Sequence, residues 1–536
     1  MIARLRFIAL LLMLAACTPG ADTTGMRVRV IADGKERAFT QQQPITIGQF
    51  LQKQGVTLGD FDKVYPPPLA PLSDNATITI IRVTEKDACT EEDFPFQTLT
   101  RKVNELPPGE RRVIQAGVNG RKRNCAKVTL EDGVEKQRIP GSTTIVAQPV
   151  DEIVAVGIDN KSLEPLSIAG TIAYISGGQA RVIEGNSTAQ RSLPVGGALD
   201  GRVFALAGKQ LLYTRLPGGG ATPAPENADA AQQINELWLL PDVSDPKSDP
   251  VRLLDDVLYA EWVPGRANTF SYSTGRWSDK YPGNHEALND LIIATLDPKT
   301  NKLAQAQKLI ARGLNGLYAF WGTQFRWSPD GKALAWAQAD GVGVVDLKTG
   351  KPSKLVDFKV YSATLPRGWL WVPSLSWSPS GGLLAAAIHG PPEAQEAPDA
   401  SPIFNLVIKP EKGTFEVTLA ERVGMWARPQ YSPLRADGSE GSLAYLRARD
   451  GVNSLNSEYD IVIADRDGSN ADVLFPSPGK AGLRPVDDFA SDLVWSSDAA
   501  QLLCAYQGNL WLIDLTTKRA TVITVVDDAR LPRWGR

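Results

Sequence analysis

Near its middle the chain reads Trp327-Ser328-Pro329-Asp330-Gly331, and versions of this run return further along. Each version is followed by two short apolar segments, a turn rich in Asp, Gly, Lys or Thr, and a more polar segment. Four short strands that repeat roughly every fifty to sixty residues are typical of β-propeller blades. The later versions are Trp377-Ser378-Pro379-Ser380-Gly381, Tyr431-Ser432-Pro433 and Trp495-Ser496-Ser497-Asp498.

The number of blades follows from the second strand of each repeat. A propeller over residues 158–536 with about seven blades is expected, and six is the alternative because the opening repeats match the motif poorly. The motif resembles the WD40-like repeat of the Tol-system periplasmic propeller, clearly in two blades and in degraded form elsewhere. The predicted second strands are 171–176, 211–216, 269–274, 333–337, 383–388, 442–446 and 502–506.

The first repeat lacks an initial strand, and the end of the chain offers one. Leu531-Pro532-Arg533-Trp534-Gly535-Arg536 is similar to the start of another motif. We therefore expect this segment to supply the innermost strand of the first blade. Such closure removes the free strand edges that an open array would expose.

A different kind of sheet is expected before the propeller, at residues 84–157. Its segments alternate polar and apolar residues over long stretches, with glycine turns such as 117–120 and 131–133 between them. Alternation without a helical period indicates a thin sheet with water on both faces and little core. The pattern resembles the G-five (G5) domain of surface proteins, and the resemblance implies an association with N-acetylglucosamine-containing polymers of the cell wall.

Two features of this module leave alternatives open. The basic residues between 111 and 127 could meet wall polyanions or lipid headgroups, or could simply solubilise an exposed strand. Cys89 and Cys125 could form a disulfide or remain separate thiols, whereas Cys504 lies in an apolar run and is expected in the core. The basic residues are Arg111, Arg112, Arg121, Lys122, Arg123 and Lys127.

Residues 26–83 predict a small β-grasp domain. An Asp33-Gly34 turn joins two strands, a short helix is expected from Ile47 to Gln54, and a further strand runs over 76–83. The module resembles the ubiquitin-like domain of wall-associated proteins such as resuscitation-promoting factors, where it serves as a spacer or binding unit. The shared residues are Asp33-Gly34, Thr46-Ile47-Gly48, Gly55-Val56-Thr57-Leu58-Gly59, Asp62-Lys63-Val64 and Pro71-Leu72-Ser73-Asp74.

The start of the chain predicts an export signal. Arg4 and Arg6 precede an apolar stretch, 7–16, that is too short to span a bilayer. Leu14-Ala15-Ala16-Cys17 resembles the lipobox of bacterial lipoproteins, which implies a signal peptide at 1–16, a lipidated Cys17 and a tether at 17–25. The expected location is extracytoplasmic, on the outer face of the cell membrane, or on the periplasmic or outer-membrane side if the host has two membranes.

Composition limits the partners. The formal net charge is −3 and the chain is 22% charged and 43% hydrophobic, which gives no electrostatic basis for nucleic-acid binding. At 536 residues several domains are expected. The whole is predicted to be mainly β, with a β-grasp domain, a G5 sheet and a propeller.

Few residues suggest catalysis or metal binding. His285 and His389 are the two histidines, and neither has a metal-ligand spacing. A G-x-S-x-G elbow is absent. His285, Glu286 and Asp290 form the best polar cluster, which we expect to be a solvated insertion. No cofactor and no metal are predicted.

Large aromatic residues give a stronger lead. A ring recurs five or six residues before successive blade motifs, at Trp321, Trp371, Trp426 and Phe489, and Trp369 is an additional ring beside Trp371. Rings around a channel mouth suit sugar or peptide binding, or alternatively they wedge between blades.

Together these features favour a lipid-anchored binding or scaffold protein of the cell envelope. Its stalk would engage wall glycan, and its propeller would present a recognition surface, with a protein partner possible. The alternative is a wall-acting glycan or lactone hydrolase with its site in the propeller channel.

Overall fold

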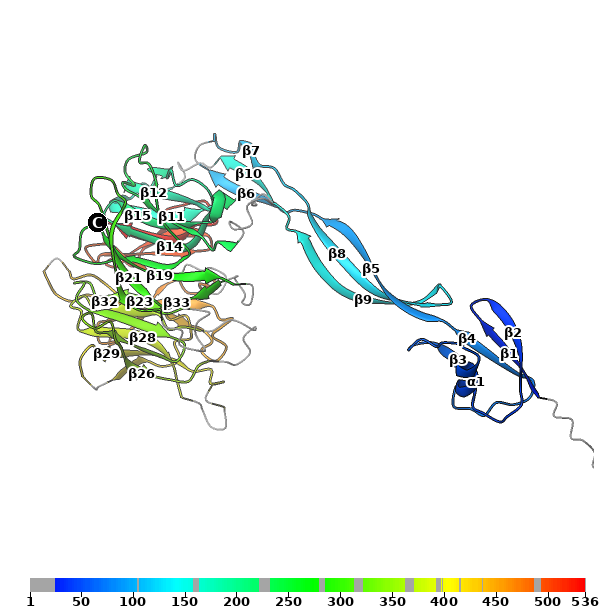
Figure 1. Cartoon of the computed structure of the whole chain (residues 1–536). Coiled ribbons are helices and arrows are strands. Elements are labelled where there is room, and N and C mark those ends of the chain that lie inside the picture. Colours follow the sequence, from blue (N-terminus) through cyan, green and yellow to red (C-terminus); the bar gives the residue numbers. More distant parts are fainter. Residues whose placement is uncertain are drawn as a thin grey trace, which may run out of the picture. The chain divides into compact units, whose positions relative to one another are not determined.

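The computed structural model describes residues 25–103, 106–157, 163–220, 232–278, 285–312, 322–361, 371–391, 397, 399–413, 416–435, 437–485 and 493–535. The chain divides into two compact units, one comprising residues up to Leu99 with Val113–Ile153 and the other Thr100–Arg112 with Val154–Arg536. Both are built mainly from strands, which confirms the predicted fold class (Figure 1). No helix in the described residues is long and apolar enough to cross a membrane.

The first module is the predicted β-grasp domain. Its sheet has the order β2-β1-β4-β3, in which β1 and β2 form an antiparallel hairpin and β1 and β4 run parallel. Helix α1 begins at a capping box, because Thr46 and Gln49 each accept a hydrogen bond from the other's backbone N–H. The elements are β1 (Met26–Ala32), β2 (Lys35–Gln41), α1 (Ile47–Lys53), β3 (Lys63–Tyr65) and β4 (Ala76–Ile81).

The apolar side of α1 explains why this small module holds together. Ile47, Phe50 and Leu51 are buried and belong to one hydrophobic cluster with residues of β1 and β4, including Val30 and Ile78. At the hairpin turn, Asp33 and Gly34 both have positive φ, as the predicted two-residue turn requires.

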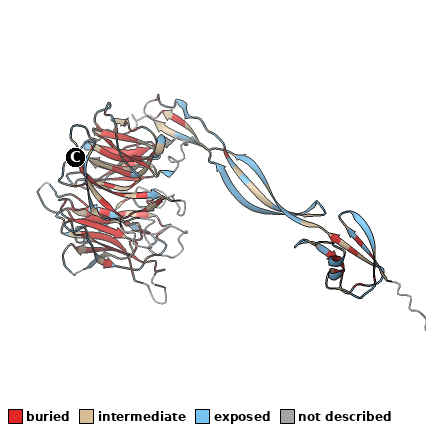
Figure 2. Cartoon of the chain, viewed as in Figure 1, coloured by how far each residue is buried: buried red, intermediate tan, exposed pale blue. Residues whose placement is uncertain are grey.

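The G5 region contains two three-stranded sheets. One has the order β5-β8-β9 and the other β6-β10-β7. All fourteen residues of β9 are exposed and Val128 is the buried hydrophobic residue of β8, so the predicted thin sheet is confirmed (Figure 2). The strands are β5 (Val83–Phe94), β6 (Thr98–Val103), β7 (Arg111–Gln115), β8 (Gly120–Glu131), β9 (Val134–Ala147) and β10 (Glu152–Gly157).

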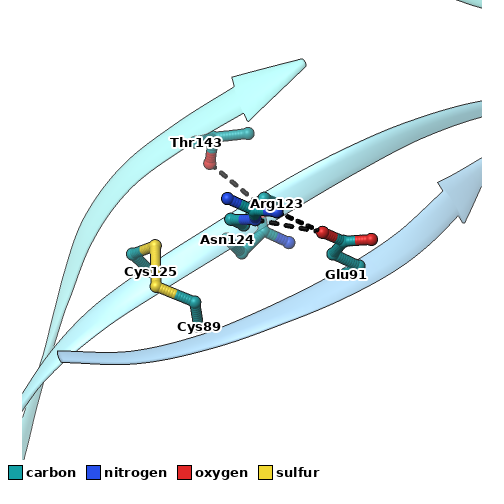
Figure 3. The surroundings of a disulfide bond; sticks show 6 residues. All are labelled: Cys89, Glu91, Arg123, Asn124, Cys125 and Thr143. Atoms are coloured by element: carbon teal, nitrogen blue, oxygen red, sulfur yellow. Dashed lines mark hydrogen bonds and ion pairs between the residues drawn. A yellow bond between two sulfur atoms is a disulfide. The ribbon is translucent and has the colours of Figure 1, made fainter. Parts of the chain in front are cut away.

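A disulfide joins β5 to β8 in this thin sheet. Cys89 and Cys125 lie directly opposite each other in the antiparallel register, and their sulfur atoms are bonded at 2.12 Å (Figure 3). Of the two alternatives that the sequence left open, the structure therefore shows the bonded pair. A cross-link of this kind typically stabilises a fold by about 2–4 kcal/mol, mainly by restricting the unfolded chain. In a sheet with little core, that contribution is large.

Seven sheets make up the propeller in the described part of the chain. The first is completed by β39 (Arg530–Gly535), in the order β13-β12-β11-β39. The first three blades comprise β11 (Ser167–Ser176), β12 (Gln179–Asn186) and β13 (Gln190–Ser192); β14 (Leu199–Ala207), β15 (Gln210–Arg215), β16 (Glu236–Leu240) and β17 (Val251–Asp255); and β18 (Val257–Trp262), β19 (Thr269–Trp277), β20 (His285–Ala287), β21 (Leu291–Leu296) and β22 (Leu303–Ile310).

The remaining four blades each have four strands in sequence order. They comprise β23 (Gln324–Trp327), β24 (Leu334–Gln338), β25 (Gly341–Val345) and β26 (Pro352–Asp357); β27 (Leu375–Trp377), β28 (Leu383–His389), β29 (Phe404–Pro410) and β30 (Val417–Ala420); β31 (Gln430–Tyr431), β32 (Ser442–Ala448), β33 (Tyr459–Asp465) and β34 (Asp472–Phe475); and β35 (Val494–Trp495), β36 (Gln501–Tyr506), β37 (Asn509–Asp514) and β38 (Ala520–Val522).

Strand β39 closes the ring as predicted. It pairs antiparallel with β11, placing Trp534 opposite Ile172, and it also contacts β14 of the second blade and β35 and β36 of the seventh. The first blade therefore combines strands from both ends of the propeller. The described residues form seven propeller sheets, which is the predicted number and not the alternative six.

Candidate functional site

The tryptophan of each blade motif bonds to the preceding blade. Trp377 donates its indole N–H to the carbonyl oxygen of Arg326 at 2.9 Å, and Trp495 donates to Gln430 at 3.1 Å. Trp327 donates to the Ser271 hydroxyl at 2.8 Å. These rings are buried, so the motif aromatic residues fasten one blade to the next and are not available to a ligand.

Trp262 has the same role, which its degraded motif did not predict. Its indole N–H donates to the carbonyl of Ala205 in the second blade at 3.0 Å. The sequence feature that could have identified Trp262 is Trp262-Val263-Pro264-Gly265. This run is a degraded copy of the blade motif that keeps the aromatic residue, the proline and the glycine and lacks the serine.

The serine of the motif organises the turn after the innermost strand. Ser328 is buried, accepts a hydrogen bond from the backbone N–H of Ala333 at 2.9 Å, and donates its hydroxyl to Asp330 at 2.7 Å. That hydrogen bond lowers the pKa of Asp330, and Ser496 lowers the pKa of Asp498 in the same way. The motif is therefore a structural signature of the blade.

The predicted ligand-binding rings divide into two groups. Trp321, Trp369 and Phe489 lie outside the described residues, so their role stays a prediction. Trp371 is only 1% exposed, donates its indole N–H to the carbonyl of Met425 at 2.7 Å, and packs edge-on against Phe404. Its ring thus takes the wedge role that the sequence left as the alternative, between the fifth and sixth blades.

Trp426 is partly buried between two hydrophobic clusters. One cluster joins the fifth and sixth blades and the other joins the sixth and seventh. The structure does not bring Trp371 and Trp426 together as the rim of an open binding surface.

The basic residues of β8 in the G5 region are matched by acidic residues on the neighbouring strand β5. Across β5 and β8, Arg123 pairs with Glu91 at 2.6 Å and Lys122 with Glu92 at 2.8 Å. Further pairs join Lys127 to Glu85 and Arg121 to Asp93. Four of the six basic residues of the possible polyanion-binding stripe therefore belong to a ladder of ion pairs, because the sheet register places acidic β5 beside basic β8. The other two, Arg111 and Arg112, are exposed on β7, where Arg112 pairs with Glu110.

The histidine-containing cluster is structural, and it is not the solvated insertion that we expected. His285 and Asp290 are buried, and Asp290 accepts hydrogen bonds from the backbone and hydroxyl of Thr274 at 2.8 and 2.7 Å. Glu286 forms an ion pair with Arg276 at 2.5 Å. These bonds occupy polar atoms of Asp290 and Glu286. They hold the β19–β20 hairpin in place within the third blade.

His389 has a similar structural environment. Its ring is buried and stacks on Phe404, with Nδ1 2.6 Å from the carbonyl oxygen of Lys359 and Nε2 2.7 Å from that of Ser401. Both ring nitrogens are therefore occupied. Across the described residues, no group of three or more His, Cys, Asp or Glu side chains is placed to hold a metal ion.

A cavity of about 270 Å³ lies between the third and fourth blades. Its wall combines aromatic and aliphatic side chains with a few polar ones, which is the usual composition of a small-molecule site. The third blade contributes Asn289 and Ile310, and the fourth contributes Thr323, Phe325, Trp336, Gln338, Val345, Pro352 and Lys354.

The cavity has its origin in an unusual strand. Strand β25 has glycine at alternate positions, Gly341 and Gly343, and Gly343 lies directly opposite Trp336 in the register. A Cβ at Gly343 would lie 2.0 Å from the carbonyl oxygen of Ser353 and 2.6 Å from the Trp336 indole nitrogen. Without side chains at these positions, the Trp336 ring and the Lys354 stem can lie across the sheet.

One polar chain crosses the cavity wall from blade to blade. Gln338 Nε2 donates to the Thr323 hydroxyl at 2.7 Å, and that hydroxyl donates to Asn289 Oδ1 at 2.9 Å. These residues could not be predicted from the sequence, because no local motif links positions that meet only when two blades pack together. The glycine alternation in β25 was the one local signal.

Two family models match the chain. Residues 85–159 match the G5 domain, and residues 28–68 match the G5-linked ubiquitin-like domain. No curated protein matches the chain.

Solved structures similar to parts of the chain include the G5 domain of IgA1 protease, at 24% identity over 15% of this chain and 93% of that one, with a TM-score of 0.13. A putative TolB from Agrobacterium tumefaciens is 15% identical over 49% of this chain and 89% of its own, with a TM-score of 0.28. A protein from Lactobacillus plantarum is 11% identical over 68% of this chain and 99% of its own, with a TM-score of 0.40.

Proposed function

We propose that this protein is a lipid-anchored scaffold of the cell envelope that binds N-acetylglucosamine-containing wall polymers through its G5 module. The match of residues 85–159 to the G5 domain is the observation that carries the proposal. The propeller is then the head that the stalk holds close to the wall.

The surface of the G5 sheet suits a neutral polysaccharide. The ladder of ion pairs across β5 and β8 matches positive with negative charge along the strands. Beside it lies the exposed hydroxyl of Thr143 on β9, which donates to the half-buried Asn124 at 2.9 Å (Figure 3). Exposed aliphatic residues of β9, including Ile139 and Ile145, add apolar area for the sugar C–H faces.

Retention on insoluble polymers tests the glycan part of the proposal. The full exported chain should be retained on chitin and much less on cellulose, a matched polymer with hydroxyl groups in place of acetamido groups. Because the sheet is close to neutral, retention should change little when the salt concentration rises, whereas a polyanion-binding surface would release its ligand. Soluble N-acetylglucosamine oligomers should compete. Equal retention on chitin and cellulose would exclude recognition of the acetamido group.

Substitution of Cys17 tests the anchor. In the native host, Cys17→Ala should abolish incorporation of a fatty-acid label and move the protein from the detergent phase to the aqueous phase, because two or three acyl chains hold a protein stably on a membrane. Cys504→Ala is the control, since Cys504 is the unpaired, buried cysteine of the described residues and should leave labelling intact. Persistent labelling of Cys17→Ala would exclude the lipobox.

A further inference from the structure

The end of β3 and the segment after it form an exposed apolar run on the β-grasp domain. Leu69 is 90% exposed, the highest value for a large apolar side chain among the described residues, and Tyr65 is 56% exposed. Pro66 and Pro67 between them are exposed as well, and residues 65–69 include no charged side chain. We call residues 65–69 the apolar loop. A contiguous apolar run on a surface, unlike a single exposed residue, indicates an interaction site.

The backbone of the apolar loop is held against the start of helix α1. The N–H of Gly48 donates to the carbonyl of Pro68 at 2.7 Å. The N–H of Ile47 donates to the carbonyl of Ala70 at 3.0 Å, and the N–H of Ala70 donates to that of Pro67 at 2.9 Å. Each proline also fixes its own φ. An ordered backbone therefore presents the exposed side chains, so a contact through them costs little conformational entropy.

The apolar loop lies at the end of the domain where the N-terminal tether joins β1. Just after the loop, the N–H of Leu72 donates to the carbonyl of Ile45 at 2.9 Å. Ile45 follows the end of β2, where Gln41 lies opposite Met26, the first residue of β1. Strands β1 and β4 run parallel, so the loop before β4 and the tether before β1 meet the sheet at the same end.

The length of the tether sets how far this end can lie from a lipid anchor. Residues 18–25 separate Cys17 from β1, and these eight residues span less than about 30 Å when fully extended. An anchor at Cys17 therefore keeps the apolar loop close to the bilayer. Short linkers give effective concentrations in the millimolar range, so even a weak contact would form.

The size of the apolar loop favours a bilayer over a protein partner. A stable protein interface takes about 20–30 residues on each side, whereas the loop spans residues 65–69. A fluid bilayer requires no complementary shape. An aliphatic side chain beside an amphipathic phenol is also a combination that suits the boundary between headgroups and acyl chains.

We propose that Tyr65 and Leu69 enter the headgroup boundary of the membrane that carries the lipid anchor, so that this end of the β-grasp domain lies on the bilayer. The inference rests on the anchor at Cys17 proposed above and adds a second membrane contact to it. Stable attachment to a membrane commonly takes two such signals. The second contact also fixes which end of the domain faces the bilayer.

The test couples the mature chain, residues 17–536, to vesicles through the Cys17 thiol. Vesicles of phosphatidylcholine with a small fraction of maleimide-bearing phosphatidylethanolamine capture this thiol, because Cys89 and Cys125 are bonded and Cys504 is buried. The comparison is the same chain with Cys17 blocked by N-ethylmaleimide, mixed with the same vesicles. Since the coupling is chemical, the result does not depend on whether the host acylates Cys17, which the fatty-acid label tests separately.

Hydroxyl-radical footprinting read by mass spectrometry measures the contact. Oxidation of Tyr65 and Leu69 should fall severalfold on coupling, because apolar groups at a membrane surface lie about 5–10 Å inside the headgroup boundary. Phe61 is the internal reference, since it is 61% exposed and precedes β3, whereas Tyr65 ends that strand. Oxidation of Phe61 should change little, and the ratio of Tyr65 to Phe61 corrects for radicals that the lipid consumes.

Leu69→Ser should restore the oxidation of Tyr65 in the coupled chain. A side chain that is 90% exposed can be replaced with little effect on folding, which footprinting of the blocked variant verifies. Val452→Ser is the matched control, because Val452 is 59% exposed and lies in the propeller, and it should leave the protection of Tyr65 intact.

Two results on coupling would overturn the proposal: an unchanged ratio of Tyr65 to Phe61, or protection of Tyr65 that Leu69→Ser does not reduce. Protection in the blocked chain that increases with protein concentration would assign the apolar loop to a second copy of the chain and would overturn it as well.

Discussion

Removal of residues 531–536 is expected to open the propeller and cause the chain to aggregate. Residues 531–535 form most of β39, the innermost strand of the first blade, and without them the edge of β11 from Thr171 to Ala173 loses its pairing partner. Unpaired strand edges of this length are templates for association with other chains. Thermal unfolding and light scattering should show a lower midpoint and early aggregation.

The deletion also removes contacts with the second and seventh blades. Leu531 packs against the cluster between the first and second blades, and Trp534 packs against the cluster between the first and seventh. Arg533 also donates to the carbonyl of Phe204 in the second blade at 2.8 Å. A chain that lacks Arg536 alone is the length control and should behave like the full chain. If the larger deletion shifts the midpoint by no more than the roughly 2–4 °C expected for about 1 kcal/mol, the ring does not depend on β39.

Trp371→Ala is expected to lower the free energy of unfolding by about 3–5 kcal/mol, the range for large aromatic residues in a core. The substitution removes a ring that is 1% exposed and leaves a cavity beside Phe404, whose ring centroid lies 4.8 Å away. It also leaves the carbonyl of Met425 without its indole donor. Urea unfolding of the full chain, monitored by the near-ultraviolet signal of the propeller, measures the change.

Trp371→Phe separates packing from hydrogen bonding. It keeps an aromatic ring and removes only the indole N–H and part of the volume, so its cost should fall well below that of alanine. A loss below about 1 kcal/mol for Trp371→Ala would show that the joint between the fifth and sixth blades repacks easily. Such a result would contradict the wedge role of this ring.

The sequence predicted the propeller because local chemistry repeats in each blade. The same serine turn recurs at Ser328, Ser378 and Ser496, so the motif marks where each innermost strand ends even when its neighbours vary. Ring closure was predictable for the same reason, since Trp534 sits in a partial copy of that motif. The glycine alternation and turn residues likewise predicted the thin G5 sheet.

The surroundings of the candidate site residues could not be predicted, because they depend on contacts between segments that are distant in the sequence. The sequence alone could not show whether the basic residues of β8 are paired. In the structure β5 lies beside β8, and Glu91 and Glu92 form ion pairs with Arg123 and Lys122. Asn289 and Gln338 likewise stand in different blades and become one polar chain only through Thr323. Burial of Trp371 depends on Met425, far along the chain.

Ring closure also sets a timetable for folding. The bond from Trp534 to the carbonyl of Ala169 joins residues 365 positions apart. Closing such a long loop adds little entropy cost, since each doubling of length adds only about 0.6 kcal/mol. In an exported chain, however, β11 leaves the membrane before β39 does, because the chain emerges from its N-terminal side. During that interval every molecule carries the open edge that the deletion makes permanent, so slower export lengthens the period of risk without changing the stability of the finished protein.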